Sequence, residues 1–518
     1  MTLGRSPQQE DLYSSTRASC EARLPEASIF RLLARDGHAL FADENFTDLF
    51  TKVGRDSIPP RIVAVVMTLQ RFHGLSDREA VDAFAFDLRW KYAAGALDFD
   101  HPGFVHTVLV DMRERLRRSV RPNRIFEAVL EVAKAAGLVG RKRVLDSTAL
   151  YDAVATQDTV TLIRSAIRGL LRVTDTALET ELRAVLRRED DYRSAGKPTC
   201  DWDDEAAREA MVDALARDGY AALVVLDNRE FAAEVKQAAV LLATVLGQDL
   251  ESTESGHFRI ARRVAENRII STVDAEARHG HKTAARGFDG YKGHVSIDPD
   301  SEIIVETAVT AGNVGDAQPA PALLSEVLSG EPQEQASVEI YGDSSYGTAD
   351  LVEHIEAAGA EANVKVQPPS PAKRGMFSQD AFQIDGDEQT VRCPAGVLVQ
   401  LRRQADGSGK AEFGSNCNQC PLRATCTTSP TGRTVRTHPK YKTLTRFRQQ
   451  QRDPTWKANY RATRPKVERK IAHMMRRKHG GRRARVRGCL RVGQDFALLA
   501  ASINLARLAK LEVAAAAA

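Results

Sequence analysis

Three acidic side chains stand where chemistry is expected. Asp146 follows a short apolar run in "VLDST", Asp343 follows another in "YGDSSYG", and Glu468 is the only carboxylate between Asp453 and Asp495. If these three carboxylates meet, their hard oxygen ligands suit a pair of Mg²⁺ or Mn²⁺ ions. Two such ions roughly 4 Å apart can activate a water and stabilise the leaving oxygen in phosphodiester cleavage.

Each acid also has an ordinary interpretation. An aspartate at the end of a strand is more often a turn or cap residue, and Glu468 lies four residues after Arg464, which is the spacing of a helical ion pair. A cluster without cations is costly, because two unit charges about 4 Å apart repel by roughly 4 kcal/mol at an effective dielectric constant near 20. The metal hypothesis therefore depends on the combination of the three residues.

The elements that would carry these acids can be read from the chain. Residues 141–153 and 336–342 read as strands, and "GYKGHVSIDPDSEIIVETAVT" reads as a strand, a turn at AspProAsp, and a second strand. Strands alternating with helices predict a mixed α/β sheet, and open sheets of this class place their sites at the carboxyl ends of strands. A helix over about 455–479 would carry Glu468 at the edge of its apolar stripe, so that Glu468 can point toward the sheet.

The segment around Glu468 is strongly basic. The whole chain has a net charge of only +4, yet Lys440 to Arg491 contains 19 Lys or Arg and two acids. Such a run can be a solvated surface or a disordered arm. The aromatic and helically spaced apolar residues between Trp456 and Met474 favour a folded basic face instead. A folded basic face indicates a phosphate-rich partner.

The remaining chain divides by composition and periodicity. Ser76 and Glu79 have capping-box spacing in a block of helices, which can be a helix-turn-helix or a plain packing unit; we expect it to bind DNA. The predicted organisation is a flexible N-terminus (1–24), a helical DNA-binding domain (25–135), a catalytic core in three parts (136–154, 266–370 and 446–512), a helical insertion (155–265) and a Cys-rich insertion (371–445).

With these motifs assembled, the chain resembles the DDE transposases of bacterial insertion sequences along essentially its whole length. "GYKGHVSID" and "AGNVGDA" are also similar to segments of that family. The resemblance implies an RNase H-like catalytic core in which Asp146, Asp343 and Glu468 are catalytic and bind two Mg²⁺ or Mn²⁺ ions. It implies that the protein binds double-stranded DNA, both terminal inverted repeats and target, as a homodimer or larger assembly, and performs strand cleavage and strand transfer.

The sequence departs from the Tyr-x2-Arg-x3-Glu-x6-Lys signature of related transposases. Arg464 and Glu468 fit it, but Tyr460 lies one residue too far upstream and Met475 occupies the lysine position. The basic residues predicted to contact DNA are Lys292, His294, Arg461, Arg464, Lys466, Arg469, Arg476, Arg477, Arg482 and Arg483.

Four of the seven cysteines fall in the Cys-rich segment. Cys393, Cys417, Cys420 and Cys426 could close a tetrahedral structural Zn²⁺ site, or they could be free buried thiols.

Other protein classes find little support. The chain has no apolar run of membrane-spanning length and no signal-like start, so we expect a cytoplasmic, nucleoid-associated protein. A Gly-rich phosphate loop, a GxSxG elbow and an HExxH motif are all missing. The alternatives that stay open are an RNase H-like nuclease and a catalytically inactive DNA-binding protein.

Overall fold

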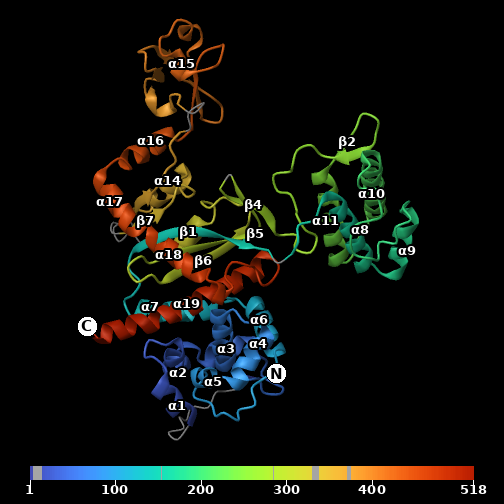
Figure 1. The fold of residues 1–518 in the computed structure, drawn as a ribbon, viewed down its shortest axis with the longest axis vertical. Coiled ribbons are helices and arrows are strands. Elements are labelled where there is room, and N and C mark those ends of the chain that lie inside the picture. Colours follow the sequence, from blue (N-terminus) through green and yellow to red (C-terminus); the bar gives the residue numbers. More distant parts are fainter. Residues whose placement is uncertain (4–14, 153, 284, 330–337, 370–374, 518) are drawn as a thin grey trace.

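The computed structural model describes residues 1–3, 15–152, 154–283, 285–329, 338–369 and 375–517. A sheet lies at the centre of the molecule, and the N-terminal helices lie below it in Figure 1. A helical block projects to one side of the sheet, and the Cys-rich segment lies at the far end from the N-terminus. The chain therefore has the mixed α/β architecture that its pattern predicted.

The central sheet is mixed. Its strand order is β4-β5-β1-β7-β8, and β6 also pairs with β5. The strand β1 runs antiparallel to β5 and parallel to β7, while β7 runs parallel to β8. The strands are β1 (Lys142–Tyr151), β4 (Arg278–Thr283), β5 (Arg286–Ile297), β6 (Ile304–Ala311), β7 (Glu339–Gly342) and β8 (Glu361–Val364). The predicted first strand and the predicted hairpin are thus confirmed.

Helices cover both faces of this sheet. Successive strand residues point to opposite faces, and accordingly Leu145 and Val144 belong to different cores. Leu145 packs with α12 (Ala320–Leu328), α14 (Ala349–Ala357) and α16 (Tyr441–Gln450). Val144 packs in the core that contains α18 (Pro465–Met474) and α19 (Cys489–Ala517).

The N-terminal helices share a core with the sheet. Helix α19 packs between β6 on one side and the N-terminal helices on the other, as Figure 1 shows. The predicted capping box is present, since Ser76 and Glu79 each bond the other's backbone amide. The helices are α1 (Ser15–Arg23), α2 (Ile29–Leu40), α3 (Pro60–His73), α4 (Asp77–Phe86), α5 (Leu88–Ala93), α6 (Thr107–Arg118) and α7 (Arg124–Ala135).

Two further units have cores of their own. The helical insertion contains α8 (Thr159–Val173), α9 (Thr176–Val185), α10 (Glu205–Leu226), α11 (Ala233–Asp249) and the short ribbon β2 (Leu250–Ser252) with β3 (Phe258–Ile260). The Cys-rich segment contains β9 (Gln383–Asp385), β10 (Thr390–Arg392), β11 (Leu398–Gln400), β12 (Arg402–Arg403), β13 (Gly409–Glu412), β14 (Thr434–Thr437) and α15 (Arg423–Cys426).

The structure differs from the sequence-based expectation at two places. Within the N-terminus expected to be loose, Ser15–Arg23 forms α1 and buries Cys20; residues 4–14 lie outside the described residues. The single basic helix expected over 455–479 is two helices, α17 (Pro454–Thr463) and α18. Pro465 begins α18 because a proline has no N–H to continue a helix but fits its first turn.

No described helix combines the length and the apolar character needed to cross a membrane.

Candidate active site

The two aspartates leave the sheet side by side. Val144 of β1 pairs with Tyr341 of the parallel neighbour β7. Asp146 and Asp343 each lie two residues further along, so the strand period of two places both on the same face of the sheet, at the carboxyl end of β7. This is the face on which α18 packs.

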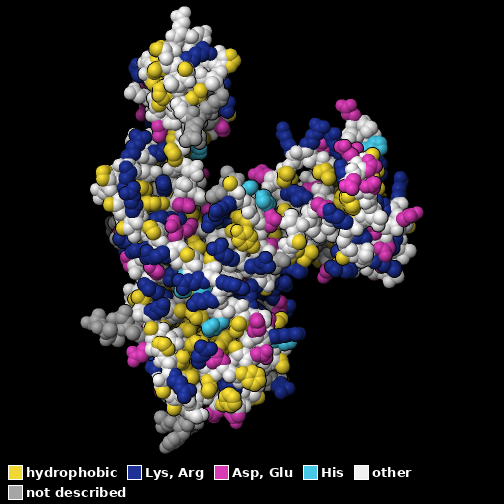
Figure 2. Space-filling view, in the orientation of Figure 1, with side chains coloured by type: hydrophobic (Ala, Val, Ile, Leu, Met, Phe, Trp, Pro, Cys, Tyr) yellow, Lys and Arg dark blue, Asp and Glu magenta, His cyan; other side chains and the backbone are white. Residues whose placement is uncertain are grey.

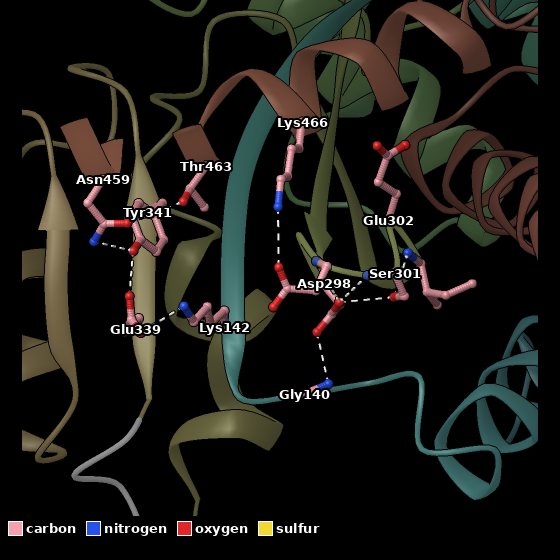
Figure 3. Close-up of polar contacts among 12 residues, drawn as sticks. Gly140, Lys142, Asp298, Ser301, Glu302, Glu339, Tyr341, Asn459, Thr463 and Lys466 are labelled. Carbon is pink, nitrogen blue, oxygen red and sulfur yellow. Dashed lines mark hydrogen bonds and ion pairs between the residues drawn. The ribbon is translucent and has the colours of Figure 1, made fainter. Parts of the chain in front are cut away.

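The helix pair α17 and α18 is fixed to this face by apolar and polar contacts. Val467, Ile471 and Met474 of α18 are buried in the core that includes β1. Asn459 of α17 donates a hydrogen bond to the Tyr341 hydroxyl (2.8 Å), and Lys466 pairs with Asp300 in the β5–β6 turn (3.2 Å). Figure 3 shows these contacts reaching β7 and the turn on either side of β1.

The turn that receives Lys466 is itself rigid. Asp298 accepts hydrogen bonds from the Ser301 hydroxyl (3.0 Å) and from the Gly140 amide just before β1 (2.8 Å), as Figure 3 shows. The strand that carries Asp146 and the helix that carries Glu468 are therefore anchored to the same turn.

One guanidinium meets all three acids. Arg464 lies at the break between α17 and α18, and its Nη2 is 3.0 Å from Asp146 Oδ1 and 3.7 Å from Asp343 Oδ2. Its Nη1 is 3.5 Å from Glu468 Oε1. The side chain of Arg464 is only 5% exposed, whereas the exposed fractions are 15% for Asp146, 40% for Asp343 and 64% for Glu468. The three predicted acids thus converge on one site that opens to solvent at Glu468.

The electrostatics of the site are dominated by burial. Burial raises the pKa of Asp146 to about 6, although Arg464 opposes the shift. Burial acts to lower the pKa of Arg464, but the nearby carboxylates, Asp146 first, outweigh it and raise that pKa. The Arg464 guanidinium does not fully neutralise this desolvated carboxyl, which is therefore suited to bind a cation of higher charge.

Tyr460 also borders the site. Its hydroxyl donates to the carbonyl of Gly342 (3.2 Å), directly before Asp343, and its ring stacks on Trp456. Burial raises the pKa of Tyr460 to about 12, so the hydroxyl is neutral at pH 7. Its displacement by one residue from the signature position therefore does not remove it from the neighbourhood of the acids.

The residues predicted to contact DNA differ in exposure, and Arg464, described above, is buried among the acids. Six arginines are exposed: Arg461, Arg469, Arg476, Arg477, Arg482 and Arg483. Figure 2 shows Lys and Arg side chains gathered across the middle of this face, where α18 and α19 lie. Lys466 and Arg469 are engaged with Asp300 and Glu302.

Lys292 and His294 are not on the surface. Lys292 forms an ion pair with Asp316 (2.8 Å), and His294 is fully buried with a pKa lowered by burial to about 4. Their expected positions on one face of a strand are correct, but that face is covered.

Comparisons with known protein families complete this picture. Residues 392–509, which include Glu468, match the family model described as "Transposase DDE domain". Residues 18–115 match the model described as "Transposase domain (DUF772)". These two matches indicate an insertion-sequence DDE transposase. No curated protein matches it.

The matched segments cover the two ends of the transposase. They contain the N-terminal helices and the α17–α18 pair, but Asp146 and Asp343 lie between them. The family matches therefore do not bear on these two aspartates, whose roles are argued from their sequence motifs and their geometry.

Among the described residues of the transposase, no group of three or more His, Cys, Asp or Glu side chains is arranged to hold a metal ion. The three acids surround a guanidinium instead. Cys393, Cys417, Cys420 and Cys426 line one small cavity of about 20 Å³, and none of the four forms a disulfide. A structural Zn²⁺ at these cysteines stays a prediction.

Sequence reasoning missed the central place of Arg464 in the transposase. It treated this residue as the i, i+4 partner of Glu468 and as a DNA contact. The residue also pairs with both aspartates, which lie on distant strands. No local pattern in the sequence signals these contacts.

Proposed function

We propose that this transposase binds the terminal inverted repeats of its element, cleaves the DNA strands there by metal-assisted hydrolysis, and joins the liberated 3′ hydroxyl to target DNA. The observation that carries the proposal is the meeting of Asp146, Asp343 and Glu468 at one partly open site, beside exposed arginines. The match of the Glu468 segment to a transposase DDE domain supports it.

We further propose that the central sheet is an RNase H-like core. Supporting this, β5 and β6 form an antiparallel hairpin beside β1, and β7 and β8 follow in parallel on the other side. The proposed domain organisation would then place the helical and Cys-rich insertions between strands and helices of this core without disturbing the sheet.

The donor set fits a divalent cation. The three acids supply only carboxylate oxygens, the ligands that Mg²⁺ and Mn²⁺ prefer. The raised pKa of Asp146 reflects a buried carboxyl that the guanidinium does not fully compensate. Asp146, Asp343 and Glu468 would hold the ions, which when bound would supply Lewis acidity toward water and a phosphodiester. Arg464 would be released from the acids and available to a phosphate.

Other residues of the chain would orient the DNA. The exposed arginines Arg476, Arg477, Arg482 and Arg483 follow α18 directly and would bind backbone phosphates beside the acids. Tyr460, neutral at pH 7, would offer its hydroxyl or ring face next to Asp343. The N-terminal helices, which match a transposase domain, would recognise the inverted repeats.

The test uses the purified protein with Mg²⁺ and labelled element ends. We expect wild type to nick the ends and to join them to target DNA, and Asp343→Asn to bind the ends normally but to cleave none. Normal cleavage by Asp343→Asn would refute the assignment of this residue. Cleaved ends that never join a target would identify a nuclease instead, and binding without any cleavage by wild type would favour an inactive DNA-binding protein.

A further inference from the structure

A buried polar cluster lies directly behind the candidate site, on the opposite face of the sheet. Asp316 lies in the turn after β6. It accepts a hydrogen bond from the Ser147 hydroxyl (2.8 Å) and forms an ion pair with Lys292 (2.8 Å). Lys292 also donates to the Val314 carbonyl (2.8 Å). Asp316 and Lys292 have exposed fractions of only 13% and 14%. A buried ion pair stabilises a fold poorly compared with apolar residues of similar volume, so its presence here calls for an explanation beyond packing.

The register of the sheet separates this cluster from the acids. Asp146 pairs with Val295 and Ser147 with His294 across β1 and β5. Because neighbouring strand residues point to opposite faces, Asp146 faces Arg464 while Ser147 faces Asp316. The cluster therefore does not touch the reacting groups directly.

One residue links the two faces. The backbone N–H of Ser147 donates to Asp146 Oδ1 (2.8 Å), the same oxygen that Arg464 contacts. The other oxygen of Asp146, Oδ2, takes part in neither bond. A chain of contacts thus runs from Lys292 through Asp316 to the Ser147 hydroxyl, and from the Ser147 backbone N–H to the carboxylate of Asp146.

The surroundings connect the cluster with the site electrostatically. Tyr346 is fully buried, and its hydroxyl has no hydrogen-bond partner within the described residues. Burial raises the pKa of Tyr346, and Asp316, Asp146 and Asp343 raise it further, so this side chain lies near carboxylates of both faces.

We propose that Asp316 and Lys292 are positioning residues: by fixing Ser147, they hold the carboxylate of Asp146 in the orientation that a divalent cation requires. The inference rests on the proposed function, because it assigns these residues to the same site. Partners of this kind act through the ligand they orient, and their loss typically weakens metal binding by 10- to 100-fold.

The experiment measures Mn²⁺ binding to the full-length protein without DNA, by titration calorimetry or by the electron paramagnetic resonance signal of free Mn²⁺. Ser147→Ala removes the hydroxyl with little change of volume. We expect it to weaken Mn²⁺ binding about tenfold and to raise the Mg²⁺ concentration at half-maximal cleavage by the same factor. Cleavage at saturating Mg²⁺ should stay within about twofold of wild type, because the variant keeps the backbone N–H that bonds Asp146 and excess metal offsets the weaker binding.

Ser296→Ala is the matched control. Ser296 is a fully buried serine on the neighbouring strand β5, and its hydroxyl has no partner within the described residues. We expect its Mn²⁺ affinity to equal that of wild type. The double variant Lys292→Met with Asp316→Leu replaces the ion pair by apolar side chains; its thermal midpoint should stay close to that of wild type while its Mn²⁺ affinity falls like that of Ser147→Ala.

The outcomes separate the two levels of the hypothesis. If wild type binds Mn²⁺ and Ser147→Ala binds it equally well, the positioning role is wrong and the metal site stands. If Ser296→Ala weakens binding as much as Ser147→Ala, the effect is a general loss of packing and the inference is again wrong. If wild type binds no Mn²⁺ at either acidic or neutral pH, the proposed function itself fails.

Discussion

Removal of the guanidinium from the centre of the three acids should destabilise the protein in a pH-dependent way. In wild type, the pKa of Asp146 is about 6 rather than its ordinary 3.8. Protonated Asp146 therefore makes the folded protein more stable than ionised Asp146 does. This extra stability is complete below pH 3.8 and is lost as the pH rises through 6. Since a tenfold change in proton affinity is worth about 1.4 kcal/mol, the ionised carboxyl costs about 3 kcal/mol above pH 6.

In Arg464→Gln, the pKa of Asp146 should rise further, because the nearest positive charge is gone. The destabilisation of the folded protein by Asp146 then grows, but it cannot exceed the free energy of protonating the carboxyl in the folded state. That limit is about 5 kcal/mol at pH 7.5. The variant should thus lose at most about 2 kcal/mol relative to wild type at pH 7.5, and almost nothing at pH 6. Asp343 and Glu468 are 40% and 64% exposed, so solvent screens their contribution.

Thermal unfolding in EDTA at pH 6.0 and pH 7.5 measures this difference. The midpoint of Arg464→Gln should fall below that of wild type by a few degrees at pH 7.5 and should match it at pH 6.0. Added Mg²⁺ should stabilise the variant more than wild type, because the cation and the guanidinium compete for the same carboxylates. Arg461→Gln, an exposed arginine one turn earlier on α17, is the control and should match wild type throughout.

Two results would refute this reasoning. An equal loss at both pH values would mean that Arg464 acts through packing rather than charge. An equal gain from Mg²⁺ in the variant and in wild type would mean that Arg464 and the cation do not share ligands.

Three further predictions concern metal and DNA binding. Mn²⁺ affinity should fall about tenfold for each pH unit below 6, as Asp146 is protonated, and should level off above pH 7; a flat profile would exclude Asp146 as a ligand. The DNA affinity should fall with salt, and Ala at Arg482 or Arg483 should each reduce the log-log slope by about 1; unchanged slopes would place DNA elsewhere. Purified protein should contain about one Zn²⁺ per chain, lost in Cys420→Ser; titration of all seven thiols in wild type, rather than only Cys20, Cys200 and Cys489, would show that the four cysteines are free.

Asp146 and Asp343 could be singled out from the sequence because each follows a short apolar run. Their meeting follows from one pairing, Val144 with Tyr341, which the sequence does not specify. The burial of the Lys292 and His294 side chains was not predicted, because it too depends on contacts between distant segments. Alternation assigns both residues to one face, but only the position of the turn after β6 decides that Asp316 lies against that face.

The helix that carries Glu468 shows a different limit. Its apolar stripe predicted correctly which side is buried, because helical periodicity is local. The break at Pro465 is equally local and was available from the sequence, yet a continuous helix was expected. What no local pattern contains is the meeting of Asp146 and Asp343 with Arg464, since those two contacts join residues more than a hundred positions apart.

The position of Glu468 depends on the N-terminal helices as well as on the sheet. His479, five residues after the end of α18, is fully buried and bonds the Phe72 carbonyl of α3. Arg71 of α3 bonds the carbonyl of His479 and pairs with Asp495 of α19 (3.0 Å). The same core encloses α3, α18 and α19, so the helix that carries Glu468 is held against the N-terminal helices by packed side chains as well as by these hydrogen bonds.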